Sequence, residues 1–214
     1  MTKRITISTL DAMKASGDKF VMITAYDATF ARLASEAGAE TILVGDSLGM
    51  VLQGHETTIP VSLEAMVYHT ECVARAKPRS LIVADLPFMS FSNPDDALHA
   101  STQLMQSGAQ MVKLEGGTWL SDSIHRLVER GVPVCAHLGL TPQSVNVFGG
   151  YRVQGRTPKE AKSILADAVE IQDAGASLLV KSVGATSATA DTKMLSIGVV
   201  AGTDPGSTAT NRSR

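Results

Sequence analysis

Three acidic residues stand at the ends of apolar segments that read as strands. Asp46 follows TILVG, Asp85 ends SLIVAD and Glu115 ends MVKLE. The carboxyl ends of parallel strands meet at one edge, and ligands of α/β proteins bind there. Three carboxylates at one mouth would repel each other unless a hard cation such as Mg²⁺ lay between them. Each alone could equally be a helix cap or a surface charge, but three at successive strand ends favour a metal site.

Other polar residues lie near the same predicted edge. Lys113 precedes Glu115 by two positions, so both point to one side of a strand; its ammonium could hold a substrate carboxylate or pair with one of the acids. His137 follows VPVCA, where a neutral imidazole could donate to a bound oxygen. A lone histidine in a strand is more often a core residue. Ser47 lies among the glycines of GDSLGM, which allow close approach to a ligand but also serve as turn residues.

The elements that would position these residues alternate regularly along the chain. Near-continuous hydrophobicity in the apolar runs is typical of parallel strands buried on both faces. The predicted strands begin at Phe20, Thr41, Ser80, Met111, Val132 and Ser177. Helix starts are predicted at Asn93-Pro94 and Thr157-Pro158. Helix stops with a left-handed glycine are predicted at Gly38, Gly108, Gly131 and Gly175.

Alternation of strands and helices predicts a β/α barrel or a doubly wound sheet. No GxGxxG turn follows the first strand, which favours the barrel over a dinucleotide-binding fold. A related unit recurs in AGAETILVGD, SGAQMVKLEG and AGASLLVKSV. A barrel of this type usually takes about 250 residues, so we expect an incomplete barrel over residues 1–183. After LSIGVV no large apolar residue follows, and residues 184–214 are expected to form a divergent, poorly ordered tail.

Composition narrows the ligand class. The chain has 214 residues, 44% of them hydrophobic, and a net charge of -2, which suits one core and a small ligand rather than nucleic acid or an anionic membrane. The N-terminus has no apolar stretch typical of a secretory signal, and no segment is long enough to span a membrane. Cys72 and Cys135 are expected to be buried thiols of a protein in the reducing cytoplasm.

Longer strings of the sequence are recognisable together. ITAYD, LVGDSLGMVLQGHETTIPVSLEAMVYHT, ADLPFMSF, MVKLEGG and VPVCAHLGLTPQSVNVFGGYRVQGR closely resemble the ketopantoate hydroxymethyltransferase family, from about Ser8 to Val180. The resemblance implies a (β/α)₈ barrel of the phosphoenolpyruvate/pyruvate superfamily with an extra N-terminal helix. It also implies a cytoplasmic homodecamer, although an altered chain could fail to assemble.

The resemblance further implies a site and a reaction. Asp46, Asp85 and Glu115 would hold or surround Mg²⁺, the glutamate partly through water, and the two aspartates would also border the substrate. Ser47, Lys113 and His137 would contact the keto acid. The family transfers a hydroxymethyl group from 5,10-methylenetetrahydrofolate to 3-methyl-2-oxobutanoate, giving ketopantoate for pantothenate and coenzyme A synthesis. Mg²⁺ would stabilise the enolate formed on the way.

The sequence departs from the family at one position that matters for this chemistry. Ser182 of LLVKS stands where the family has its general-base glutamate, so no catalytic base is assigned here. A hydroxyl is no base at neutral pH, and loss of a positioned base typically costs about 10² to 10⁴ in rate. A catalytically dead barrel that still binds Mg²⁺ and the keto acid is therefore the alternative to an active transferase. A lyase or mutase of the same superfamily is disfavoured, because no cysteine-bearing catalytic loop is visible.

Overall fold

The computed structural model describes residues 3–182 and 197–201. These residues form one parallel sheet whose seven strands follow each other in chain order. The strands are β1 (Met22–Thr24), β2 (Thr41–Val44), β3 (Leu81–Asp85), β4 (Met111–Glu115), β5 (Val134–Gly139), β6 (Leu178–Ser182) and β7 (Gly198–Ala201). Each of the six predicted apolar runs contains one of the first six strands.

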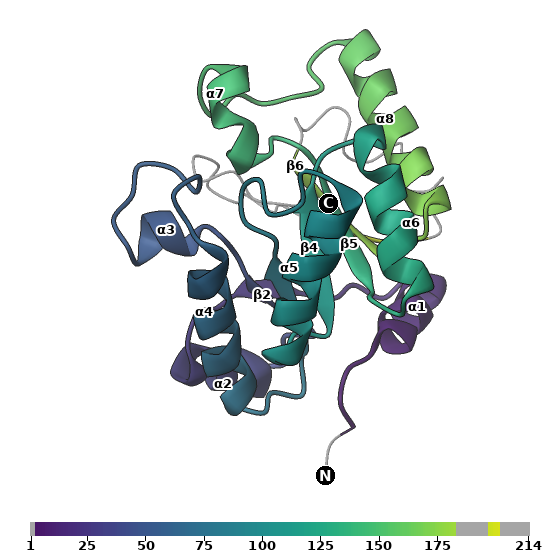
Figure 1. Cartoon of the computed structure of the whole chain (residues 1–214). Helices are drawn as coiled ribbons and strands as arrows, with labels where there is room; N and C mark the ends of the chain where they lie inside the picture. The colour runs from purple at the N-terminus through teal and green to yellow at the C-terminus, as the bar shows by residue number, and fades with distance from the viewer. Residues whose placement is uncertain (1–2, 183–196, 202–214) are drawn as a thin grey trace.

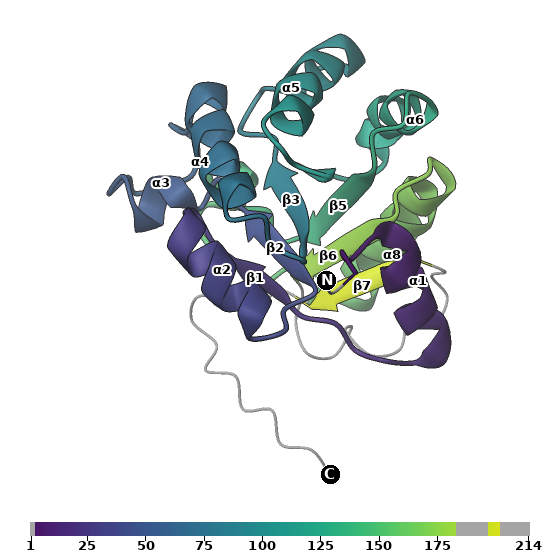
Figure 2. The same ribbon diagram turned by 90° about the horizontal axis from the view of Figure 1, so that it is seen from below.

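Helices cover one face of this curled sheet. Figure 2 shows α2, α4, α5, α6 and α8 in an arc outside the strands. The helices are α1 (Ile7–Ser16), α2 (Ala28–Glu36), α3 (Leu48–Val51), α4 (Leu63–Arg75), α5 (Pro94–Gln106), α6 (Ser121–Glu129), α7 (Val145–Phe148) and α8 (Pro158–Asp173), with 3₁₀ turns η1 (Thr118–Leu120) and η2 (Pro142–Ser144). The arrangement confirms the predicted incomplete barrel.

The predicted helix boundaries are confirmed by their hydrogen bonds. Asn93 caps α5 by accepting from the N–H groups of Asp95 and Asp96. Thr157 and Glu160 form a reciprocal capping box at the start of α8, which satisfies donors that a helix start otherwise leaves unpaired. The predicted stop glycines all have positive φ, with values of 98° at Gly38, 112° at Gly108, 80° at Gly131 and 106° at Gly175.

The two faces of the strands build two separate apolar clusters. One cluster joins the outer face to the helices, and the other fills the inside of the curl. The inner cluster takes alternate strand positions, among them Leu81 and Val83 of β3 and Leu178 and Val180 of β6. Because side chains alternate along a strand, the next inward position at the carboxyl end of β3 is Asp85. The interior is therefore apolar toward the amino ends of the strands and polar at their carboxyl ends, which we call the carboxyl mouth.

The N-terminal helix implied by the family resemblance is present as α1 and packs on the inner cluster. Ile5 and Leu10 are buried in that cluster, with Ile7 and Met13 packed against it. The Ile5 N–H donates to the Arg79 carbonyl at 2.7 Å, beside the start of β3. Figure 1 shows α1 at the end of the sheet opposite α7. This helix thus covers the amino end of the interior.

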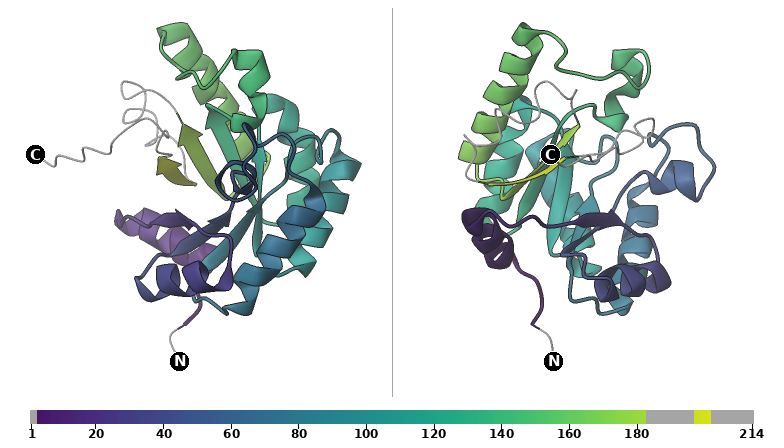
Figure 3. Two further views of the ribbon diagram at one scale, coloured as in Figure 1. Left: turned by 90° about the vertical axis from the view of Figure 1, so that its left-hand side faces the viewer. Right: turned by 180° about the vertical axis from the view of Figure 1, so that it is seen from behind.

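Strand β7 falls within the range predicted as a tail. It pairs in parallel with β6, with Gly198 opposite Leu178, and it lies at the sheet edge (Figure 3). The rest of the predicted tail lies outside the described residues, so the boundary at residue 183 stays a prediction.

Cys135 is buried, as expected. The expectation that Cys72 is buried is wrong, because Cys72 lies on α4 and is only half-buried. Among the described helices, none has the length and apolar content needed to cross a bilayer.

Truncation of Leu10 tests the contribution of α1 to the interior. Leu10 is 3% exposed, so Leu10→Ala should leave a cavity and lower the free energy of unfolding by about 2–5 kcal/mol. Urea denaturation measures this change. Leu33→Ala on α2 is the matched control, because Leu33 is 55% exposed and should change stability by only about 0.5 kcal/mol. Equal effects of the two substitutions would contradict the packing role of α1.

Candidate active site

Five of the predicted site residues are buried together at the carboxyl mouth. Asp46 lies two residues after β2, and Asp85 and Glu115 are the last residues of β3 and β4. Strand register sets Asp85 opposite Lys113 and Glu115 opposite His137. All five are at most 6% exposed. Charged groups are almost never buried so deeply unless they are paired. Four of these residues are joined by ion pairs, whereas Asp46 accepts a hydrogen bond from Gln143.

Lys113 is the cation at the centre of the cluster. Its Nζ lies 2.5 Å from Asp85 Oδ1 and 3.5 Å from Glu115 Oε1. The Asp46 N–H donates to the other Asp85 oxygen, Oδ2, at 3.1 Å. Of the two roles considered for Lys113, the structure supports that of a partner to the acids. Contact with a keto acid stays a prediction.

Burial and charge shift the pKa values of the acids in different directions. Burial, reinforced by Asp85 and then Glu115, raises the pKa of Asp46 well above its usual range. Burial also raises the pKa of Asp85, although Lys113 opposes it. For Glu115 burial is outweighed by Lys113 and His137, which lower the pKa to about 2. Burial would lower the pKa of Lys113, but Asp85 and the other carboxylates raise it. Lys113 and Glu115 are therefore charged.

His137 links the cluster to Ser182. Its Nδ1 lies 2.9 Å from Glu115 Oε1, and its Nε2 lies 3.1 Å from Ser182 Oγ. An ionised carboxylate can only accept, so Nδ1 carries the proton and, in the neutral ring, Nε2 accepts from the Ser182 hydroxyl. Register pairs Gly139 with Ser182, which brings the hydroxyl to this mouth. Ser182 is therefore the donor to a neutral His137 ring and the acceptor from a protonated one.

Gln143 is a site residue that the sequence analysis missed. It lies in η2 after β5 and is 6% exposed. Its Nε2 donates to Asp46 Oδ2 at 2.8 Å and to the Leu86 carbonyl at 2.9 Å, and its backbone N–H donates to Glu115 Oε2 at 3.0 Å. One residue thus fastens two of the acids. The sequence feature that could have identified Gln143 is its position shortly after the end of a predicted strand.

Ser47 lies at the border of the cluster. Its Oγ is 2.9 Å from the Tyr26 hydroxyl, a second residue that the sequence analysis did not assign. Burial raises the pKa of Tyr26. Gly45 beside it requires a close approach, because a Cβ there would lie 2.8 Å from Ser47 Oγ and 3.4 Å from Asp85 Oδ2. Only glycine at position 45 leaves enough space for the Ser47 hydroxyl and the Asp85 carboxylate beside it.

The donor chemistry of the cluster suits a hard divalent cation. Three carboxylates face one lysine ammonium, and burial raises the pKa of two of those carboxylates. Carboxylate oxygens are the ligands that Mg²⁺ prefers, and a divalent ion would offset the excess negative charge. In their present positions, however, no three His, Cys, Asp or Glu groups of residues 3–182 and 197–201 are arranged to hold a metal. The ligand set Asp46, Asp85 and Glu115 stays a prediction.

Solved structures share this fold. The chain resembles phosphonopyruvate hydrolase, solved in complex with oxalate and Mg²⁺, with a TM-score of 0.65 and 16% identity, over 90% of this chain and 78% of that one. It also resembles 2,3-dimethylmalate lyase, a member of the PEP mutase/isocitrate lyase superfamily, with a TM-score of 0.58 and 18% identity, over 82% and 62%. At these identities the likeness shows the fold alone, a β/α barrel.

The sequence defines the family more narrowly. Residues 4–208 match the profile of ketopantoate hydroxymethyltransferase. The 3-methyl-2-oxobutanoate hydroxymethyltransferase of Burkholderia vietnamiensis is 56% identical over 204 residues, covering 94% of this chain and 75% of the relative. That of Ralstonia nicotianae is 51% identical over 196 residues, covering 91% and 72%. The chain belongs to the ketopantoate hydroxymethyltransferase family. The match reaches residue 208, beyond the Val180 limit of the resemblance described above.

Removal of the Lys113 charge tests the ion-paired cluster. Lys113→Met would leave buried carboxylates without their cation and should lower the free energy of unfolding by about 3–5 kcal/mol. Denaturant titration measures the loss. Lys159→Met is the control, because Lys159 is exposed on α8 and should change stability by at most about 0.5 kcal/mol. A Lys113→Met protein as stable as the parent would show that the pair contributes little.

Proposed function

We propose that the chain binds 3-methyl-2-oxobutanoate with Mg²⁺ at the carboxyl mouth and converts the keto acid to ketopantoate. The hydroxymethyl group would come from 5,10-methylenetetrahydrofolate. The observation that carries this proposal is the buried, excess-acid cluster of Asp46, Asp85, Lys113 and Glu115 in a member of this family. We further propose a cytoplasmic location and, from the family, assembly into a homodecamer.

The proposed roles follow from the positions of the side chains. Asp46, Asp85 and Glu115 would hold Mg²⁺, which supplies Lewis-acid polarisation of the keto oxygen. Lys113, held 2.5 Å from Asp85, would place positive charge beside the anion that develops when the C3 proton leaves. His137 and Ser47 present polar atoms at the same mouth for the keto acid.

Proton abstraction is the step for which this chain is least equipped. The Ser182 hydroxyl is hydrogen-bonded to His137 Nε2, and a neutral hydroxyl cannot accept a proton from carbon at neutral pH. This observation favours a second candidate function, in which the chain binds Mg²⁺ and the keto acid without turnover. The two candidates differ in one measurable step, loss of the C3 proton.

Solvent deuterium exchange at C3 of 3-methyl-2-oxobutanoate, with Mg²⁺ and without folate, separates the two. Because Ser182 provides no base, we expect slow exchange with the parent chain: a rate slightly above the protein-free rate supports the transferase, and a rate equal to it supports the binding-only candidate. Ser182→Glu should raise the exchange rate by about 10²- to 10⁴-fold, because it supplies a general base beside His137. Proton NMR measures the exchange.

Ser163→Glu is the matched control for that experiment, since Ser163 is exposed on α8. Fast exchange by the parent chain would rule out the binding-only candidate. No exchange by Ser182→Glu, in a protein that still binds the keto acid, would contradict the transferase proposal.

Metal dependence of keto acid binding tests the ligand set. Calorimetry should show that Mg²⁺ strengthens binding of 3-methyl-2-oxobutanoate, and that Asp85→Asn weakens Mg²⁺-dependent binding by about 10- to 100-fold. Asp173→Asn, at an exposed position in the last turn of α8, should leave it unchanged. Keto acid affinity that does not depend on Mg²⁺ in the parent chain would contradict the proposed metal role.

A further inference from the structure

A second polar site lies at the opposite end of the sheet from the acidic cluster. A cavity of about 1000 Å³ is lined by the end of α2, the end of α4, the segment leading into β3 and the segment before α1. Its lining residues are Arg4, Arg32, Ser35, Glu36, Ala74, Ala76, Lys77, Pro78 and Arg79. None of them belongs to the carboxyl mouth.

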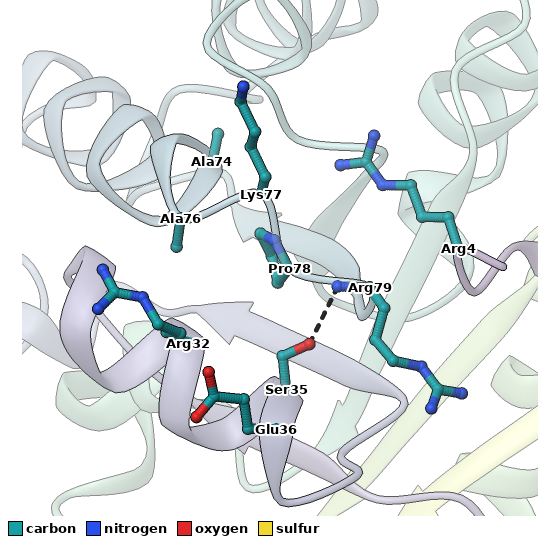
Figure 4. A pocket seen from close by; sticks show the side chains of 9 residues that line it. All are labelled: Arg4, Arg32, Ser35, Glu36, Ala74, Ala76, Lys77, Pro78 and Arg79. Carbon is teal, nitrogen blue, oxygen red and sulfur yellow. Dashed lines mark hydrogen bonds between the residues drawn. The ribbon is translucent and has the colours of Figure 1, made fainter. Parts of the chain in front are cut away.

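Positive charge dominates this cavity. Arg4, Arg32, Lys77 and Arg79 face a single carboxylate, Glu36, in a chain whose net charge is -2. Figure 4 shows Lys77 and Arg79 on either side of Pro78, with Arg4 and Arg32 on two other segments and the charged ends pointing in different directions. Within residues 3–182 and 197–201, none of the four takes part in an ion pair. Four cations gathered without acidic partners form a surface suited to an anion.

Compensation of helix dipoles does not account for this clustering. Cations are favourable in the last turn of a helix, but α2 has no basic residue there and α4 already has Arg75. Arg4 and Arg79 lie outside any helix. At most Lys77, just past the end of α4, could act in this way.

The backbone holds the cavity wall in place. The Arg79 N–H donates to Ser35 Oγ at 3.0 Å, and the Arg79 carbonyl accepts from Ile5 N–H at 2.7 Å. These two bonds join the segment before β3 to α2 and to the segment that carries Arg4. Pro78 and Ser35 are buried. The cationic side chains therefore start from backbone positions that are already ordered.

Lys77 occupies a backbone conformation that usually belongs to glycine. Its φ is 50°, whereas the equivalent stop positions after α2, α5, α6 and α8 are Gly38, Gly108, Gly131 and Gly175. A side chain in this left-handed region carries a conformational cost that glycine avoids. At α4 alone among these helices the chain has a lysine there, and its ammonium lines the cavity.

We propose that this cavity binds a diphosphate group, toward which the exposed side chains of Arg4, Arg32, Lys77 and Arg79 turn as ligands. Guanidinium groups bind phosphate oxygens in pairs, and an ammonium adds a compact charge. The volume is at the upper end of the range for small-molecule sites. Ala74 and Ala76, which are half-buried, offer an apolar wall for an organic part attached to the phosphates.

Calorimetry of the full chain with inorganic diphosphate, without divalent cations, tests the proposal. We expect saturable binding that is tighter than for inorganic phosphate and that weakens at high salt. Lys77→Gly should weaken it about tenfold through loss of one charge-assisted contact. Because glycine relaxes the backbone at this position, the variant should fold at least as stably as the parent chain. Arg32→Ala should weaken binding to a similar extent.

Lys159→Ala, at an exposed site on α8, is the charge-matched control and should bind diphosphate like the parent chain. The proposal is overturned if diphosphate shows no saturable binding. It is also overturned if Lys77→Gly and Arg32→Ala bind as tightly as the control. Tighter binding of an RNA oligonucleotide or of anionic lipid vesicles than of diphosphate would overturn it as well, because the surface would then serve a macromolecule.

Discussion

The contact between the Lys113 ammonium and the Asp85 carboxylate is the interaction on which the carboxyl mouth depends. Lys113 and Asp85 lie on adjacent strands and are buried at an interface between an apolar interior and polar loops. A buried carboxylate without a cation is very costly. The one ammonium lets three acids remain inside the curl. Gln143 holds two of them, because its side-chain amide donates to Asp46 and its backbone N–H donates to Glu115. The polar layer is thus built around one positive charge.

The sheet and the inward-facing part of the site follow from local rules, which is why the sequence predicts them well. Period-two alternation in a strand sets Lys113 and Glu115 on one side, and helix caps at Asn93 and Thr157 depend on neighbouring residues only. These features do not depend on distant parts of the chain.

Contacts made by loops and by register could not be read from the sequence in the same way. Gln143 meets Asp46 across 97 positions, and the Ser182 hydroxyl meets His137 because β5 and β6 pair with one specific offset. The central place of Lys113 between two acids also depends on three-dimensional packing, and so does the partial exposure of Cys72. Strand β7 is absent from the six predicted strands because Gly198–Ala201 lies within the segment expected to form a tail.

The strict agreement of strand order with chain order has a consequence for how the molecule forms. Each strand from β2 to β7 is added beside the strand that precedes it in the chain, so most strand pairing joins segments that are near in sequence. All six pairs are parallel, so each must close a crossover connection before its strands can pair, and sheets of this kind form slowly. The strand order therefore spares the sheet any long crossing connection, while the pairing of each strand from β2 to β6 still depends on the helix that precedes it.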